Sequence, residues 1–393
     1  MSIDKQMNFS NKEIKFCKQC VISNQRPRIV FDEEGVCSAC RYAEEKRNII
    51  DWTKRNESLA ALCDKFRRND GRYDILVPCS GGKDASYVAH VLKDKYGMHP
   101  LTVTWAPFEQ TDIGRKNLDS FIGSGFTNLL CTPNKHLHRK LARTAFEAVG
   151  DAFQPFVYGQ MSYVFHLALG LDIKLVFFGE NGEAEYSGAT KTKEWSGMPW
   201  DYWAEQYFKG VTIHDMIKYG LTKGFVKEED FNASDLTFYA PPNIELLKKK
   251  GIEFHWLGYY HQWTPQENYF YAHEHTGFEA NPDGRSEGTY SKYASLDDKL
   301  DGFHYYLGFI KFGIGRATSD AAHEIRDGHI TREEGIALVK RFDGEFPRKY
   351  YKDFLDYISI DDDKFNEVIN RYRSEHIWEK NEDQWKLRSA IWY

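Results

Sequence analysis

Residues 73–92 have the sequence YDILVPCSGGKDASYVAHVL, in which a short apolar run is followed by two adjacent glycines and a helical pattern. The run at Tyr73–Cys79 is rich in residues that favour strands, and it stops just before the glycines. Apolar side chains then recur at Val88, Val91 and Leu92, which is the spacing of a helix. The sequence therefore predicts a strand, a tight turn and a helix.

The same alternation continues to residue 180. Further strand patterns lie at His99–Trp105, Thr127–Thr132 and Lys174–Glu180, and helical patterns lie near Ile113–Ile122, His136–Val149 and Val157–Leu169. Strands that alternate with helices are typical of a parallel sheet covered on both faces. We therefore predict an α/β fold with the glycine turn at the carboxyl edge of the sheet, where such folds bind ligands.

The remaining segments differ in pattern. An aromatic-rich insertion occupies about residues 184–242, a strand pattern returns at Glu253–Tyr260, and helices are expected over Leu296–Phe312 and Thr331–Lys340. The last of these begins with the residue types of a capping box. We expect an N-terminal module with a linking helix over 1–69, an α/β domain over 70–262 that carries the insertion, and a helical region over 263–393 that completes the site.

Composition restricts the class of protein. The chain has 393 residues, a net charge of −6 and an isoelectric point near 6.2, which argues against a protein that grips nucleic acid. It has no apolar run of about 18 residues, and its first residues lack the apolar stretch of a secretory signal. We therefore expect a cytoplasmic protein that binds neither nucleic acid nor a membrane.

Four of the seven cysteines form two close pairs, Cys17-x-x-Cys20 and Cys37-x-x-Cys40. Two such pairs predict a tetrahedral four-thiolate site, which most often holds zinc and less often an iron–sulfur cluster. A closed site of this kind leaves no open position for catalysis, so we assign the zinc a structural role. Cys79, next to the glycine turn, is expected to be a small core residue.

The glycine turn has the composition of a phosphate site. Gly81–Gly82 lets backbone N–H groups approach an anion, and the helix that begins near Asp84 points its positive end at the same place. Ser80 and Ser86 add hydroxyl donors, and Lys83 adds a positive charge. A turn without a ligand is the alternative. The spacing fits neither the common P-loop nor a dinucleotide-binding fingerprint.

The heptapeptide SGGKDAS resembles the SGG-x-D-[SA] signature of the PP-loop ATP pyrophosphatases. This resemblance implies that ATP is bound at the turn and split between its α- and β-phosphates, with Lys83 neutralising charge and Asp84 positioning Mg²⁺. It assigns the nucleotide contacts to Ser80, Gly81, Gly82, Asp84, Ala85 and Ser86.

Two further positions extend this resemblance. The end of the second strand pattern, Thr104 and Trp105, resembles the adenine-binding position of that superfamily. Glu180 and Glu183 follow the fourth strand pattern and are interpreted either as metal or substrate ligands or as part of a solvated acidic loop. For Glu185 we favour the solvated loop.

Several segments together resemble the N-acetyl sugar amidotransferases of bacterial surface-polysaccharide and nonulosonic-acid pathways. They are CKQCVISNQRPRIVFDEEGVCSAC, VPCSGGKDASYVA, FFGENGE, WTPQENYFYA and IKFGIGRATSDAAHEIRDGHITREE. This resemblance implies that the acetamido oxygen of a nucleotide-activated sugar attacks ATP, giving an adenylated imidate and pyrophosphate, and that ammonia then displaces AMP. The resemblance also places Lys311 and Arg316 near the phosphates of ATP, although each could instead be a solvated charged residue on a helix.

The source of ammonia implies a partner. A glutaminase needs a nucleophilic cysteine, but position 2 is Ser2 and no cysteine lies in a glycine-flanked elbow. Similar enzymes use a separate glutaminase subunit, often with a channel-forming companion, and we expect the same here. The aromatic stretch Trp195–Tyr239 is a candidate docking or sugar-binding surface, or part of the core. The histidines at positions 255, 261, 273 and 275 are interpreted as structural or substrate-contacting residues and not as metal ligands.

Two other functions remain open at this point. A tRNA-thiolating PP-loop enzyme would need sulfur-handling cysteines near the ATP site and a basic surface. A non-catalytic scaffold would bind nucleotide without turnover. The sequence also leaves the sugar open among nucleotide-linked diacetamido uronic, pseudaminic and legionaminic acids, and it leaves the oligomeric state open.

Overall fold

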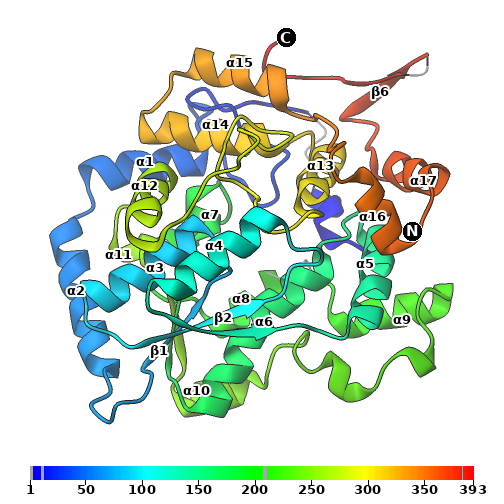
Figure 1. Ribbon diagram of the computed structural model, residues 1–393. Coiled ribbons are helices and arrows are strands. Elements are labelled where there is room, and N and C mark those ends of the chain that lie inside the picture. Colours follow the sequence, from blue (N-terminus) through cyan, green and yellow to red (C-terminus); the bar gives the residue numbers. More distant parts are fainter. Residues whose placement is uncertain (1–2, 10–12, 207–209, 383) are drawn as a thin grey trace.

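The centre of the computed structural model is a five-stranded sheet whose strands are all parallel (Figure 1). The structure describes residues 3–9, 13–206, 210–382 and 384–393. The strands are β1 (Ile75–Pro78), β2 (Pro100–Trp105), β3 (Thr127–Cys131), β4 (Leu175–Phe178) and β5 (Glu253–Trp256). Their order across the sheet is β3-β2-β1-β4-β5, so the chain reverses its direction of winding between β1 and β4. The predicted α/β fold with a parallel sheet is confirmed.

Helices cover both faces of the sheet because alternate strand residues point to opposite sides. Ile75 and Val77 of β1 pack with α2 (Trp52–Phe66), α3 (Lys83–Asp94) and α4 (Asp112–Gly123). Leu76 faces the other way, toward α5 (Lys135–Val149) and α6 (Gln154–Leu171). The strand predicted over 253–260 ends at Trp256, since residues 257–260 form the short helix α11 (Leu257–Tyr260).

The aromatic insertion extends the core on the α6 face. The described elements within it or at its ends are α7 (Gly182–Glu185), η2 (Thr190–Glu194), α8 (Trp200–Gln206), α9 (Ile213–Lys223), η3 (Glu228–Asp230), η4 (Ala233–Leu236) and α10 (Ile244–Lys250). The rings of Trp200 and Trp203 contact Phe165 of α6 edge-on, and Trp203 is fully buried. Tyr207 lies outside the described residues. Trp200 and Trp203 therefore belong to the core and do not form an exposed docking surface.

The C-terminal region lies over the carboxyl edge of the sheet. It comprises α12 (Pro265–Thr276), α13 (Asp301–Phe312), α14 (Arg316–Asp327), α15 (Arg332–Phe342), α16 (Tyr351–Ile358), α17 (Asp362–Tyr372), and the hairpin of β6 (Trp378–Asn381) and β7 (Gln384–Leu387). The predicted capping box is present at the start of α15. The helix expected from residue 296 starts only at 301, because the Asp298 carboxylate accepts backbone N–H groups of Phe108 and Leu300 and so holds a turn.

The N-terminal module packs against this C-terminal region although the two are remote in sequence. It consists of η1 (Lys5–Phe9), the cysteine-bearing loops and α1 (Ser38–Asn48). In Figure 1 the cysteine-bearing loops and α1 lie beside α14 and α15. Buried cysteines of the module share one apolar cluster with Ala321 and Ala322 of α14 and Val339 of α15. Both ends of the chain therefore build the same side of the molecule.

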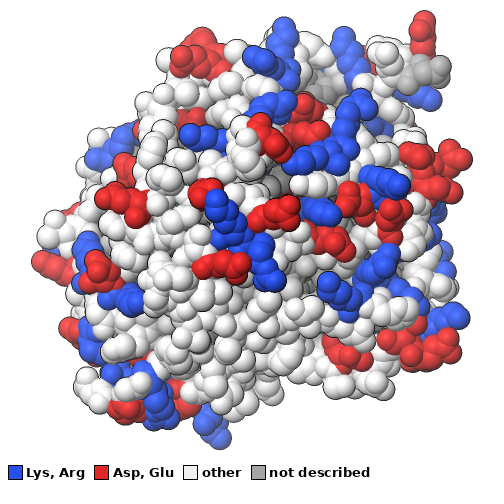
Figure 2. All heavy atoms as spheres, viewed as in Figure 1, with Lys and Arg blue, Asp and Glu red and all other residues white. Residues whose placement is uncertain are grey.

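The surface carries both signs of charge. On the face shown in Figure 2, acidic and basic side chains are interspersed over the helices, as expected for a net charge of only −6 on 393 residues. In the part of the chain that the structure describes, no helix is both long enough and apolar enough to cross a membrane.

Close packing of α6 against β2 gives a test of the fold. A Cβ atom at Gly159 would lie 2.0 Å from the indole ring of Trp105, whereas one at Gly170 of the same helix would meet nothing within 4 Å. We expect Gly159→Ala to lower the free energy of unfolding by about 1–3 kcal/mol through overpacking. Gly170→Ala should change it by less than about 1 kcal/mol. Urea unfolding would measure both, and equal stabilities would contradict this packing.

Candidate functional site

A cavity of about 640 Å³ lies between the carboxyl edge of the sheet and the C-terminal helices. Its walls include the glycine turn after β1, Glu180 after β4, Tyr305 of α13 and one face of α14. Since β1 and β4 are neighbours at the reversal of winding, the cavity occupies the position where open α/β sheets bind ligands. Its volume is within the range of small-molecule sites, about 300–1,000 Å³.

The two glycines of the turn have different roles. Gly81 has a φ of +85°, and a Cβ there would lie 2.5 Å from the backbone nitrogen of Leu118, so the fold itself requires glycine. At Gly82, which precedes the first turn of α3, a Cβ would meet only the Ser80 hydroxyl at 3.8 Å. Among the described residues no side chain caps this end of α3, so its first N–H groups remain available to an anion.

Lys83 and Asp84 hold opposite charges at the mouth of this turn. The Lys83 ammonium pairs with the Asp84 carboxylate and lies 5.2 Å from the centre of the Tyr293 ring. The other Asp84 oxygen accepts a hydrogen bond of 3.0 Å from the Asn268 amide of α12. Lys83, Asp84 and Ala85 all line the cavity. The turn therefore presents a cation, a carboxylate and backbone donors to one space.

Glu180 is the second carboxylate at this edge of the sheet. It lines the cavity immediately after β4. Burial raises the pKa of Glu180 to about 7, and the negative charge of Asp84 adds to this rise. Carboxylate oxygens are the ligands that Mg²⁺ prefers. Asp84 and Glu180 are two of the cavity-lining carboxylates that could hold it.

One face of α14 forms the opposite wall. Arg316, Asp320, His323 and Asp327 recur at helical spacing and all line the cavity. Arg316 is ion-paired with Asp320 at 3.0 Å, and its guanidinium lies 4.4 Å from the centre of the Tyr305 ring. Of these four residues, only Arg316 was predicted from the sequence. The polar stripe opposite the buried alanines of α14 is the signal that could have identified the others.

Two predicted site residues lie away from the cavity. Lys311 is buried, ion-pairs with Asp4 and donates to the Val149 carbonyl at 2.8 Å. Glu183 accepts from Arg28 at 3.1 Å and from the Ala189 backbone at 2.7 Å. Neither residue lines the cavity. Each is held by a contact remote in sequence, and both line a second cavity that shares Arg26 and Tyr305 with the first. The phosphate role of Lys311 and the metal role of Glu183 stay predictions.

Three further predicted residues are covered by protein. Ser86 is fully buried beneath the turn, with its hydroxyl 3.9 Å from the Cys79 sulfur. Thr104 donates to the Cys79 carbonyl at 2.5 Å, and Trp105 packs against α6. Because β2 is covered on both faces, its last side chains are part of the core. The side chains of Thr104, Trp105 and Ser86 therefore do not face the cavity, and the adenine and phosphate contacts expected at these positions stay predictions.

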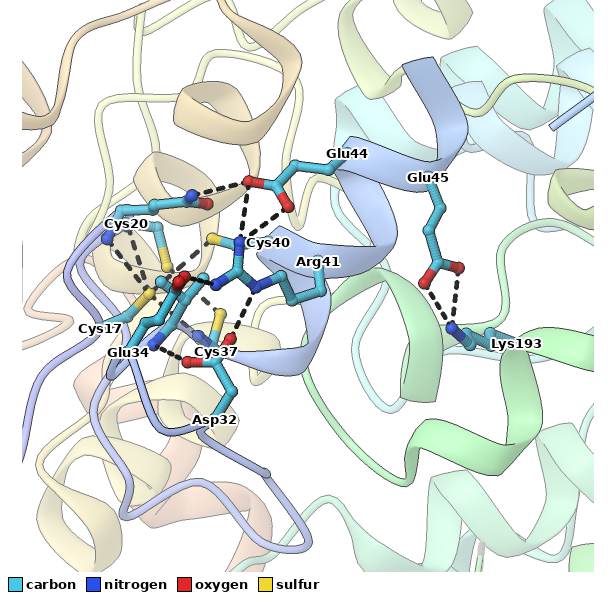
Figure 3. Close-up of polar contacts among 12 residues, drawn as sticks. Cys17, Cys20, Asp32, Glu34, Cys37, Cys40, Arg41, Glu44, Glu45 and Lys193 are labelled. Atoms are coloured by element: carbon cyan, nitrogen blue, oxygen red, sulfur yellow. Dashed lines mark hydrogen bonds and ion pairs between the residues drawn. The ribbon is translucent and has the colours of Figure 1, made fainter. Parts of the chain in front are cut away.

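The four-cysteine cluster lies behind α14. Cys17, Cys20, Cys37 and Cys40 are buried, and their sulfur atoms all lie within 4.8 Å of one another (Figure 3). Tetrahedral zinc with Zn–S bonds of about 2.3 Å would space the sulfurs by about 3.8 Å. The Cys17–Cys40 and Cys20–Cys37 pairs are 3.9 and 3.7 Å apart. The cluster therefore has the composition and spacing to hold a structural zinc ion.

Polar groups around the cluster are arranged to support thiolates. The guanidinium of Arg326 lies 3.8 Å from the Cys20 sulfur, and the Ser187 hydroxyl donates to Cys37 at 3.2 Å. Nearby in Figure 3, Arg41 joins Asp32, Glu34 and Glu44 and so fixes the loop between the two pairs to α1.

Replacing one of the four cysteines tests whether this cluster holds zinc. We expect one zinc per chain, and we expect Cys37→Ser to lose it and to lower the melting temperature, because structural zinc contributes folding free energy. The matched control is Cys63→Ser, which changes a buried cysteine of the sheet core. Elemental analysis after gel filtration would measure the metal. Bound iron, or zinc retained by Cys37→Ser, would contradict the assignment.

Comparison with known families bears on the C-terminal wall of the cavity. Residues 287–391 match the family described as LPS biosynthesis protein WbpG-like, C-terminal domain. A search of curated protein sequences returned no match to the chain. The matched segment contains α13 and α14, and thus Tyr305 and Arg316 of the cavity. This similarity associates the chain with lipopolysaccharide biosynthesis and is compatible with a sugar-modifying enzyme.

Proposed function

We propose that this protein is an ATP-dependent amidotransferase that converts an acetamido group of a nucleotide-activated sugar into an acetamidino group. One observation carries the proposal. The glycine turn and α14, which belongs to the segment similar to LPS biosynthesis proteins, line the same cavity. The proposed phosphate site and the segment similar to LPS biosynthesis proteins thus border the same cavity, so that one reaction could use both.

The charges in the cavity suit attack on the α-phosphate of ATP. In the proposed reaction the acetamido oxygen attacks this phosphorus, pyrophosphate leaves, and the oxygen becomes part of a good leaving group. The N–H groups at the start of α3 would hold the phosphates, and Lys83 and Arg316 would neutralise the charge that builds on them. Mg²⁺ between Asp84, Glu180 and the phosphates would supply further electrostatic stabilisation.

We further propose that ammonia comes from a separate glutaminase subunit, with a channel-forming companion where one is present. All seven cysteines lie within the described residues, and four of them form the metal cluster. Burial raises the pKa of Cys63 and of Cys79 to about 12 and that of Cys131 to about 11. None of these three is an activated nucleophile. The raised pKa values of these thiols also argue against a tRNA-thiolating enzyme, which would need a reactive cysteine beside the turn.

Steric blocking of the turn tests the phosphate site. Gly82→Ala should leave folding intact, because protein atoms leave room for the added methyl group. The methyl group should weaken ATP binding by tenfold or more, about 1.4 kcal/mol, since it fills the space the phosphates would use. The control, Gly123→Ala, places its methyl group where nothing lies within 4 Å. Calorimetric titration with MgATP would decide, and equal affinities would refute the site.

Product analysis tests the reaction itself. Candidate nucleotide-linked acetamido sugars would be incubated with ATP, Mg²⁺ and ammonium, and mass spectrometry would seek replacement of one oxygen by NH. We expect the wild type to form this product. Asp84→Asn should lower the rate by about 100-fold or more, because the carboxylate at the phosphates is lost. Asp94→Asn, at the exposed far end of α3, is the matched control. Absence of the amidine with every sugar would overturn the proposal.

A further inference from the structure

His323 is a buried, cavity-lining histidine without a hydrogen-bond partner. It lies on α14, is 3% exposed and lines the cavity beside Asp320 and Asp327. Neither of its ring nitrogens has a hydrogen-bond partner among the described residues. The ring is held in place by an edge-on contact with Tyr186, at 5.0 Å between centres. A buried polar group normally has a partner, so a ligand or reacting group is expected to supply it.

The surroundings orient the imidazole. Its Nε2 atom faces two carboxylates, Glu185 and Asp327, each at 3.6 Å. Glu185 is itself held by the Lys46 ammonium at 2.7 Å in a buried ion pair. With Nε2 between two carboxylates, the ring proton belongs on Nε2, and the lone pair remains on Nδ1. The arrangement therefore fixes the tautomer and leaves the lone pair of Nδ1 without a hydrogen-bond partner among the described residues.

The same environment keeps the ring uncharged. Burial lowers the pKa of His323 well below its usual value, and the positive charges of Arg326, Lys46 and Lys83, together with His329, lower it further. A neutral imidazole at neutral pH can accept a proton, whereas an imidazolium cannot. His304, which also lines the cavity, differs because its Nδ1 is paired with Asp151 at 3.0 Å.

We propose that His323 is the general base of the amination step, the group that removes a proton from ammonia as it attacks the adenylated imidate. This inference rests on the proposed function. The lone pair of ammonia forms the new C–N bond while the C=N π electrons move onto the imidate nitrogen, which leaves a positive charge on the attacking nitrogen. One of its protons passes to Nδ1 of His323. The electron pair on the imidate nitrogen then re-forms the C=N bond as the C–O bond breaks, AMP leaves with the electron pair of the C–O bond, and the amidine remains.

Separate measurement of the two steps tests this role. In His323→Gln, release of pyrophosphate in the first turnover should persist, because the carboxamide fills the space but cannot accept a proton. Amidine formation should fall by about 100-fold or more. Imidazole added to His323→Ala should restore part of it. The control is His99→Gln, an exposed histidine at the opposite end of the sheet. Zinc content and melting temperature would verify that each variant is folded.

Three results would contradict the inference. Amidine formation by His323→Gln within about threefold of the wild type would exclude a base role. Equal loss of pyrophosphate release and amidine would place His323 in the first step or in binding. Nitrogen-15 NMR of histidine-labelled protein must show a neutral ring protonated at Nε2, and the other tautomer would overturn the assignment whatever the rates. If the wild type itself formed no amidine, the proposed function would fail and this inference with it.

Discussion

The guanidinium of Arg326 joins three parts of the chain that are remote in sequence. It lies on α14, contacts the sulfur of Cys20 at 3.8 Å, and donates to the carbonyl of Glu185 at 2.8 Å. The carbonyl of Arg326 in turn accepts from the Arg47 side chain of α1. A zinc-bound set of four thiolates would carry net negative charge, which this buried arginine would offset. The orientation of α14 over the cavity therefore depends on the cysteine cluster behind it.

This dependence gives the N-terminal module a role in the site without placing it in the reaction. The cluster holds α14 on its apolar side, through Ala321 and Ala322, and leaves the polar side of the helix to the cavity. Lys46 of α1 reaches the same region and pairs with Glu185, which in turn faces His323. The four-cysteine cluster thus helps to fix the position of residues that we assign to chemistry.

Much of the fold could be predicted from local patterns. Each strand pattern from residue 73 to 256 became a strand, since apolar β-branched runs between turns depend little on distant contacts. The position of the glycine turn at the carboxyl edge followed from the alternation alone. The domain bounds at residues 69 and 262 stay a prediction. The sequence pattern was also sufficient to identify the four cysteines that cluster.

The rest of the site could not be predicted because it depends on long-range contacts. Lys311 and Arg316 are five positions apart, yet Gly313, with a φ of +65°, ends α13 between them, and the two side chains belong to different helices. Glu180 and Glu183 are three positions apart in sequence, but only Glu183 forms an ion pair with Arg28 of the N-terminal module. His323 lies in one of the segments that resemble the amidotransferase family. Its position in the cavity, however, depends on how α14 packs against the rest of the protein.

We infer that the glycine turn and α14 enclose one reaction site. A crystal structure of the protein with Mg²⁺ and a non-hydrolysable ATP analogue tests it most directly. We expect the phosphates on the N–H groups of Gly82, Lys83 and Asp84, with the metal at Asp84 and Glu180 and the α-phosphate facing the polar side of α14. Phosphates bound outside this cavity, or a nucleotide that contacts the turn while its α-phosphate points away from α14, would contradict the account.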